Sequence, residues 1–257
     1  MLAELFASSG LGASALALVA VTFLGGGVIK GALGLGLPVV VLAVLAPTLG
    51  LQAALALFLA PGLVSNVWQA VSGPYLRSVA ARLWPFLAAA MVGIALGVQV
   101  LAGEDTRALE ALLGVLLMVY SAVSLATPQI PPPGRREPWM GPLAGGLGGV
   151  MFGMTGVFIV PGILYVQALG MERDRLVQAL GLIFLTISGT LAVAMGSHGL
   201  VTPGLFVVSL AAIPFVLLGF LIGQRLRRYI SEDSFRRLFF VGLIGASLFT
   251  VWRSLFA

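Results

Sequence analysis

Apolar runs of about twenty residues follow one another along almost the whole chain. A helix needs roughly 20 apolar residues to cross a hydrocarbon core of about 30 Å. Hydrophobic residues make up 60% of the 257 residues and charged residues only 9%, whereas about a quarter of a soluble domain is charged. The sequence therefore predicts an all-α polytopic membrane protein. Six runs are predicted to cross once: residues 52–71, 83–101, 109–126, 176–195, 205–223 and 238–252.

Composition also narrows the function classes. The chain has no cysteine, which excludes disulfides, thiol nucleophiles and thiolate metal sites. It has one histidine, and its acidic residues fall in predicted loops, tails or near helix ends. An intramembrane enzyme is therefore disfavoured, and we expect no catalytic residue, metal or cofactor. The net charge of +5 comes from short basic clusters between apolar runs. Such clusters are typical of topology signals, so no nucleic-acid partner is expected.

Two further apolar regions, 11–45 and 141–169, are each broken by glycines and followed by a proline. Between the halves of the chain runs TPQIPPPGRREPWMG, whose prolines and charges are incompatible with a membrane helix. We interpret residues 127–140 as a Pro-rich cytoplasmic linker. It joins a first repeat, residues 1–126, to a second repeat, residues 141–257.

The two halves repeat one another at matched positions, which is the signature of an internal structural repeat. Matches fall in the same order along both halves, which argues against chance. The pairs are Gly31 and Gly153, Gly34 and Gly156, Pro38 and Pro161, Ser65 and Ser188, Gly93 and Gly219, Gly97 and Gly223, and the runs 104–106 and 232–234.

Arginine positions bear on the topology. If each glycine-broken region crossed once, the loop Lys and Arg residues would divide 5 against 8, which is a weak bias. If each region is a hairpin that enters and leaves on one side, eleven arginines share one side and only Arg107 and Arg253 lie opposite. The positive-inside rule then places the eleven in the cytoplasm and both termini in the periplasm. The halves become inverted repeats, each a glycine-broken helical hairpin plus three crossings, as in many secondary transporters. The eleven are Arg77, Arg82, Arg135, Arg136, Arg173, Arg175, Arg225, Arg227, Arg228, Arg236 and Arg237.

The hairpin tips are the candidate binding site. Irregular backbone at membrane depth is tolerated where it lines a cavity or is buried in protein. Short helices that begin just after the glycines would direct their N-terminal dipoles at the tips and favour an anion. Lys30 is the only lysine in the chain, and a charge inside an apolar segment costs at least about 2.5 kcal/mol unless water or a counter-ion compensates it. We therefore assign Lys30 to neutralisation of an anionic substrate.

The full candidate set includes polar residues on the helices next to the hairpins. Simpler alternatives stay open: Lys30 could reach an interface or pair with a carboxylate, the glycines could serve tight helix packing, and the hydroxyls could bond between helices. The substrate-binding candidates are Gly27, Lys30, Gly31, Gly34, Gly36, Gly153, Thr155 and Gly156 in the hairpins, and Ser65, Asn66, Gln69, Ser188 and Thr190 beside them.

Two segments resemble a known family. IKGALGLGLP in the first half and GGLGGVMFGMTGVFIVPGILYVQALGMERDRLVQAL in the second are similar to the glycine-rich repeats of the sulfite exporter TauE/SafE family, also called toluene-sulfonate uptake permeases. The resemblance covers nearly the whole chain, and Lys30 matches a position that is often basic in one branch. Such relatives are membrane permeases for sulfite, thiosulfate and organosulfonates such as sulfoacetate. The resemblance thus implies an anionic substrate, in agreement with the lysine.

Direction and coupling follow from the charges. No carboxylate is predicted at mid-membrane, which disfavours proton-driven uptake, and an inside-negative potential drives anions outward. We expect an inner-membrane exporter of a small sulfur-containing oxyanion, working by alternating access, with membrane lipid around it. An anion channel, an uptake permease for sulfate-like or thiosulfate-like anions and a non-transporting partner subunit stay open. A homodimer is compatible with a transporter of this size.

Overall fold

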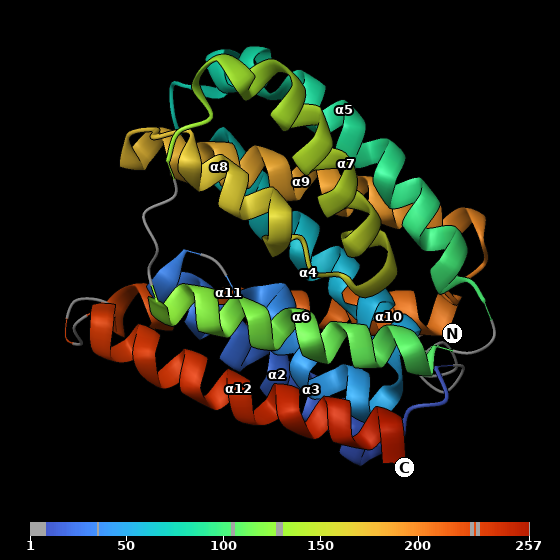
Figure 1. Cartoon of the computed structure of the whole chain (residues 1–257). Coiled ribbons are helices and arrows are strands. Elements are labelled where there is room, and N and C mark those ends of the chain that lie inside the picture. The colour runs from blue at the N-terminus through green and yellow to red at the C-terminus, as the bar shows by residue number, and fades with distance from the viewer. Residues whose placement is uncertain are drawn as a thin grey trace. The chain divides into compact units, whose positions relative to one another are not determined.

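The computed structural model describes residues 9–34, 36–103, 106–126, 131–226, 229 and 232–256, and the regular structure of that part is entirely helical (Figure 1). The chain divides into two compact units. Unit 1 comprises Met1–Gly62, Glu104–Leu125 and Gly199–Ala257, and unit 2 comprises Leu63–Gly103 and Ala126–His198. Each unit therefore draws helices from both halves of the sequence.

The predicted crossings correspond to long helices. These are α4 (Leu51–Val71), α5 (Leu76–Leu101), α6 (Arg107–Ala126) and α9 (Arg173–Ser197), followed by α10 (Pro203–Ala211), α11 (Ile213–Leu226) and α12 (Glu232–Phe256). Within the described residues, six stretches are long and apolar enough to span a membrane. Five of them match predicted crossings, and the sixth is the first arm of the first hairpin. The predicted all-α membrane fold is confirmed.

The predicted crossing at 205–223 is interrupted in the structure, where α10 ends at Ala211 and α11 begins at Ile213. The cause is Pro214, which has no N–H to donate to the carbonyl of Leu210 one turn earlier. The last predicted crossing, 238–252, belongs to the longer helix α12, whose clearly apolar part is Phe239–Ser254.

Each glycine-broken region forms two helical arms. In the first, α2 (Ala13–Leu33) is followed by α3 (Leu37–Leu49). At 1.5 Å per residue these arms are about 32 Å and about 20 Å long, so the first arm alone is long enough to span the hydrocarbon core. In the second region, α7 (Glu137–Thr155) is followed by the short π-helix η2 (Ile159–Ile163) and α8 (Leu164–Ala168).

The second part of the predicted linker is helical, and residues 127–130 lie outside the described part. A 3₁₀ turn, η1 (Gly134–Arg136), runs directly into α7, which begins at Glu137 rather than at residue 141. Pro138 occupies the first turn of α7, where a helix needs no N–H donor. A proline at that position favours the start of a helix, so α7 can begin within the predicted linker.

Glycines form a close seam between two helices in each unit. In unit 1, α2 packs against α11; in unit 2, α7 packs against α5 (Figure 1). A Cβ built on Gly31 would collide with Phe220 O and lie 3.0 Å from Gln224 N. A Cβ built on Gly153 would lie 3.0 Å from both the Cα of Gly97 and the N of Val98. Side chains larger than hydrogen are therefore excluded from both seams.

The two seams match atom for atom at the repeated positions. A Cβ on Gly219 would meet Leu24 O and Val28 N, and one on Gly93 would meet Gly146 O and Val150 N. The same relation links Gly223, facing Val28 O and Ala32 N, to Gly97, facing Val150 O and Met154 N. The first arm of each hairpin thus packs, within its own unit, against a helix from the other half of the sequence.

Two buried side chains compensate for irregular backbone. In unit 1, Pro61 interrupts α4, so the carbonyl of Leu57 lacks its helical donor. The Ser209 hydroxyl of α10 donates to Leu57 O at 2.8 Å and accepts from Ala60 N at 3.1 Å. Because a buried carbonyl without a partner is costly, Ser209 stabilises the interrupted helix.

In unit 2, the buried amide of Gln178 on α9 binds the turn between α4 and α5. Its Nε2 donates to Ala70 O at 2.9 Å and to Gly73 O at 2.8 Å, and its Oε1 accepts from Tyr75 N at 2.8 Å. One side chain therefore satisfies three backbone groups that leave or enter helices.

Candidate functional site

The first hairpin tip carries the buried lysine. Lys30 lies in the last turn of α2 and exposes only 5% of its surface. The helix ends at Gly34, whose N–H donates to Lys30 O at 2.8 Å and whose φ of 80° favours glycine. Helix α3 begins after Gly36, which has a φ of 109°, and its N-terminus has no side-chain cap. The lysine and the first turn of α3 therefore lie close together in the sequence on either side of one short turn.

The second tip has the same backbone geometry and a different charge. Helix α7 ends at Gly156, which has a φ of 76° and donates to Phe152 O at 2.7 Å. Phe152 takes the place that Lys30 has in the first tip, and it is buried with its ring edge-on to Phe158, centroids 5.9 Å apart. The positive charge is thus present in one tip only.

Three hairpin glycines belong to the packing seams. Gly27 and Gly31 face α11, and Gly153 faces α5, each at a distance that leaves no room for a Cβ. In the structure these glycines let the hairpin arms approach their partner helices. By contrast, Gly34 and Gly156 sit at the tips with φ of 80° and 76°, and a Cβ added to Gly34 meets nothing within 4 Å.

Most of the candidate polar groups, in the hairpins and on the neighbouring helices, already have partners. Thr190 donates to Thr186 O at 2.9 Å, Thr155 donates to Met151 O at 2.7 Å, and Gln69 Nε2 donates to Val177 O at 3.0 Å. Asn66 is buried and Ser65 is half-buried. Ser188 differs, because its fully buried hydroxyl has no hydrogen-bond partner among the described residues. It is the hydroxyl in this set that a bound solute could engage without displacing another bond.

A comparison of the sequence with models of known protein families identifies the family of this chain. The sequence model of the sulfite exporter TauE/SafE family matches residues 18–250, which include both hairpin tips and both seams. The chain belongs to the sulfite exporter TauE/SafE family. No curated protein and no solved structure matches it.

Membership in the TauE/SafE family fixes the general activity. The TauE/SafE family consists of membrane transporters of sulfur anions, so this chain is a multi-pass membrane transporter. The predicted membrane class and the predicted anionic substrate class are confirmed at this level.

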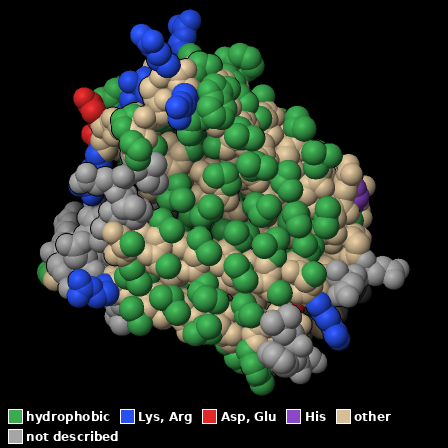
Figure 2. All heavy atoms as spheres, in the orientation of Figure 1, with side chains coloured by type: hydrophobic (Ala, Val, Ile, Leu, Met, Phe, Trp, Pro, Cys, Tyr) green, Lys and Arg blue, Asp and Glu red, His purple; other side chains and the backbone are tan. Residues whose placement is uncertain are grey.

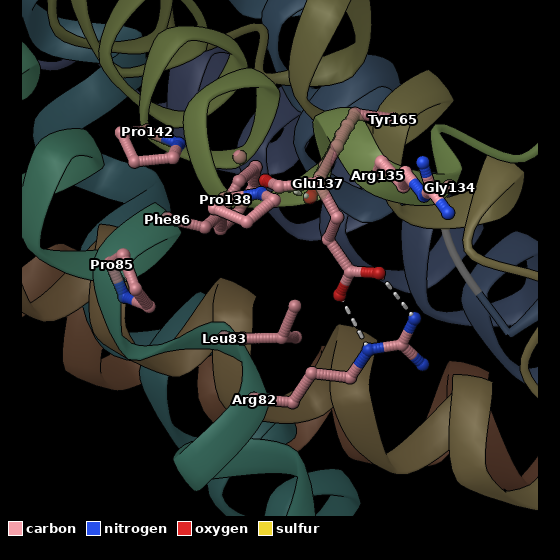
Figure 3. Close-up of a pocket in the computed structure, with 11 residues that line it drawn as sticks. Arg82, Leu83, Pro85, Phe86, Gly134, Arg135, Glu137, Pro138, Pro142 and Tyr165 are labelled. Carbon is pink, nitrogen blue, oxygen red and sulfur yellow. Dashed lines mark hydrogen bonds and ion pairs between the residues drawn. The ribbon is translucent and has the colours of Figure 1, made fainter.

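Unit 2 of this TauE/SafE chain also contains a cavity that the sequence did not reveal. Figure 3 shows Arg82 of α5 directed at Glu137, the first residue of α7. The guanidinium donates from Nε to Oε1 at 2.7 Å and from Nη2 to Oε2 at 2.9 Å. These hydrogen bonds lower the pKa of the Glu137 carboxyl. In the sequence Arg82 is interpreted only as a topology marker, because nothing local indicates its pairing with Glu137, 55 residues away.

Proposed function

We propose that this TauE/SafE protein exports a small sulfur-containing oxyanion, either an organosulfonate such as sulfoacetate or sulfite, across the inner membrane by alternating access. The observation that carries the proposal is the burial of Lys30 at the tip between α2 and α3. A buried lysine inside an apolar helix is costly and marks a substrate or ion pathway in membrane proteins. An anion is the substrate class that a cation favours.

The two tips differ in charge, and this difference favours a substrate whose bound group carries a single negative charge. Lys30 supplies one positive charge, and its counterpart Phe152 supplies none. Ser188 belongs to unit 2, and its buried hydroxyl has no hydrogen-bond partner among the described residues, so it is a separate candidate donor to an oxyanion oxygen. The backbone around Gly34, Gly36, Thr155 and Gly156 supports the tips, while Gly27, Gly31 and Gly153 allow the close helix contacts behind them.

The positions of the carboxylates support export driven by the membrane potential. In the described part of the chain, Glu110 lies in the first turn of α6, Glu137 begins α7, and Glu172 and Asp174 flank the start of α9. None of these lies in the middle of a spanning helix, where a proton-coupling carboxylate is usually found. An inside-negative potential adds about 2.3 kcal/mol per charge per 100 mV to the outward movement of an anion.

Flux into proteoliposomes tests this proposal. Purified protein should move sulfite or sulfoacetate in response to an imposed potassium-diffusion potential and show saturable counterflow, which distinguishes a carrier from a channel. The variant Lys30→Met keeps the length of the side chain and removes its charge, so its flux should fall sharply, whereas Arg225→Gln should retain wild-type flux. Transport that needs a proton gradient and ignores the potential would refute the export mechanism.

A further inference from the structure

Unit 2 contains a cavity of about 360 Å³ at the place where α5 and α7 begin. Its lining includes Arg82, Leu83 and Phe86 of α5, Arg135 of η1, Glu137 of α7 and Tyr165 of α8 (Figure 3). Two aromatic rings pack together at the floor of the cavity: Phe86 and Tyr165 stack with their centroids 5.6 Å apart. The cavity therefore combines a packed aromatic floor with charged groups at its rim.

The rim carries a net positive charge. Two arginines and one glutamate line the cavity, which gives a formal charge of +1. The bidentate ion pair with Glu137 uses two of the five N–H groups of Arg82, so three remain. Arg135 is exposed. The donors of an arginine match the paired oxygens of a phosphate or a carboxylate in a planar, bidentate manner.

Exposed apolar stripes continue from the cavity along both helices. Trp139, Leu143 and Leu147 are exposed at four-residue intervals on α7, and Trp84 and Val92 are exposed on α5. The seam contacts advance together, from Phe86 against Gly145 to Ala90 against Gly149, so the two helices run side by side in the same direction away from the cavity. Figure 2 shows several basic side chains gathered at the upper margin of a face covered by hydrophobic side chains, with others at its lower left and lower right. Tryptophan is enriched where a membrane meets water.

From this arrangement we propose that the cavity binds the phosphate of an anionic phospholipid, whose acyl chains lie along the exposed stripes of α5 and α7. The charge of the rim matches a phosphodiester with its single negative charge. The tryptophans lie at the depth of the headgroups and the leucines at the depth of the chains. A bound lipid would hold together the starts of α5 and α7, the two helices that form the seam of unit 2.

Lipid binding to the purified full-length protein tests the assignment. We would titrate the detergent-solubilised protein with phosphatidylglycerol and with phosphatidylcholine and count bound lipids by native mass spectrometry. Both lipids carry a phosphate, but choline cancels its charge in phosphatidylcholine. Phosphatidylglycerol should therefore bind about fivefold more tightly, as expected when one net positive charge meets an anionic instead of a neutral lipid. Equal binding of the two lipids would overturn the proposal.

Variants locate the site. Arg135→Gln changes an exposed residue that leaves the fold intact, and it should bring phosphatidylglycerol binding down to the level of phosphatidylcholine. Arg225→Gln removes the same charge from α11 of unit 1 and should keep the full preference. The double variant Arg82→Gln with Glu137→Gln removes the ion pair but leaves the rim charge at +1 through Arg135, so it should keep the preference for phosphatidylglycerol. An unchanged preference in Arg135→Gln would overturn the proposal.

A competition arm separates the lipid from a small anion. Inorganic phosphate and sulfite, each added in excess, should leave the bound phosphatidylglycerol in place because the acyl chains contribute most of the contact area. Full displacement by either small anion, with Arg135→Gln weakening both, would show that the cavity is a small-anion site and would refute the lipid assignment. This outcome is independent of transport, so it leaves the export proposal untouched.

Discussion

Gly153 of α7 faces Gly97 of α5 at a distance that leaves room only for hydrogen, since a Cβ on Gly153 would lie 3.0 Å from the Gly97 Cα. The corresponding contact in unit 1 joins Gly31 to Phe220 and Gln224 of α11. Membrane helices gain stability from such close approach because van der Waals packing drives their association. The seams therefore hold the first arm of each hairpin against a helix from the other half of the sequence.

Replacing Gly153 with alanine should destabilise the protein by about 1–3 kcal/mol, because the added methyl group would collide with backbone atoms of α5 that cannot move aside. Thermal unfolding in detergent measures the effect. Gly196→Ala in α9 is the matched control, since its Cβ would meet nothing within 4 Å and alanine favours a helix by up to about 1 kcal/mol over glycine. Equal melting temperatures for Gly153→Ala and the wild type would show that the seam is loose.

Removing the Ser209 hydroxyl should cost about 1–3 kcal/mol, the usual penalty for a buried carbonyl left without a donor. A double-mutant cycle identifies the cause. In the Pro61→Ala background the new N–H can donate to Leu57 O, so Ser209→Ala should then cost clearly less. Additive losses in the cycle would mean that Ser209 acts independently of the interrupted helix.

Gln178→Leu keeps the approximate size of the side chain and removes all three of its hydrogen bonds to backbone groups. We expect a loss of about 1–3 kcal/mol in the free energy of unfolding, because the buried carbonyl of Ala70 loses its donor. Gln167→Leu is the control, as Gln167 is exposed and should tolerate the change. A wild-type melting temperature for Gln178→Leu would contradict the role given to this amide.

The positions of most membrane-spanning helices were predictable, because a long apolar run indicates such a helix. The break between α10 and α11 was missed, although Pro214 could have signalled it. The packing role of Gly31 and Gly153 could not be separated from a ligand role by sequence, since both functions need the absence of a side chain. Comparing the halves does indicate that Lys30 stands opposite Phe152.

Other features of the candidate site depend on distant parts of the chain. The free hydroxyl of Ser188 is visible only once its surroundings are known, since its neighbour Thr190 has the same chemistry and bonds within its own helix. The same applies to Arg82 and Glu137, which meet from two helices separated by α6 and the linker. The sequence shows which polar residues the chain contains, but only the tertiary structure shows which of them form hydrogen bonds or ion pairs with one another.

The proposed function depends on the binding of an anionic substrate by the charge of Lys30. Calorimetric titration of the purified protein with sulfite and sulfoacetate tests this binding most directly. We predict that the wild type binds at least one of them and that Lys30→Met weakens binding by at least about tenfold, the effect of losing a charge-assisted hydrogen bond, with an unchanged melting temperature. Lys30→Arg should retain part of the affinity. Wild-type affinity in Lys30→Met would contradict the assignment of this lysine to the anion site.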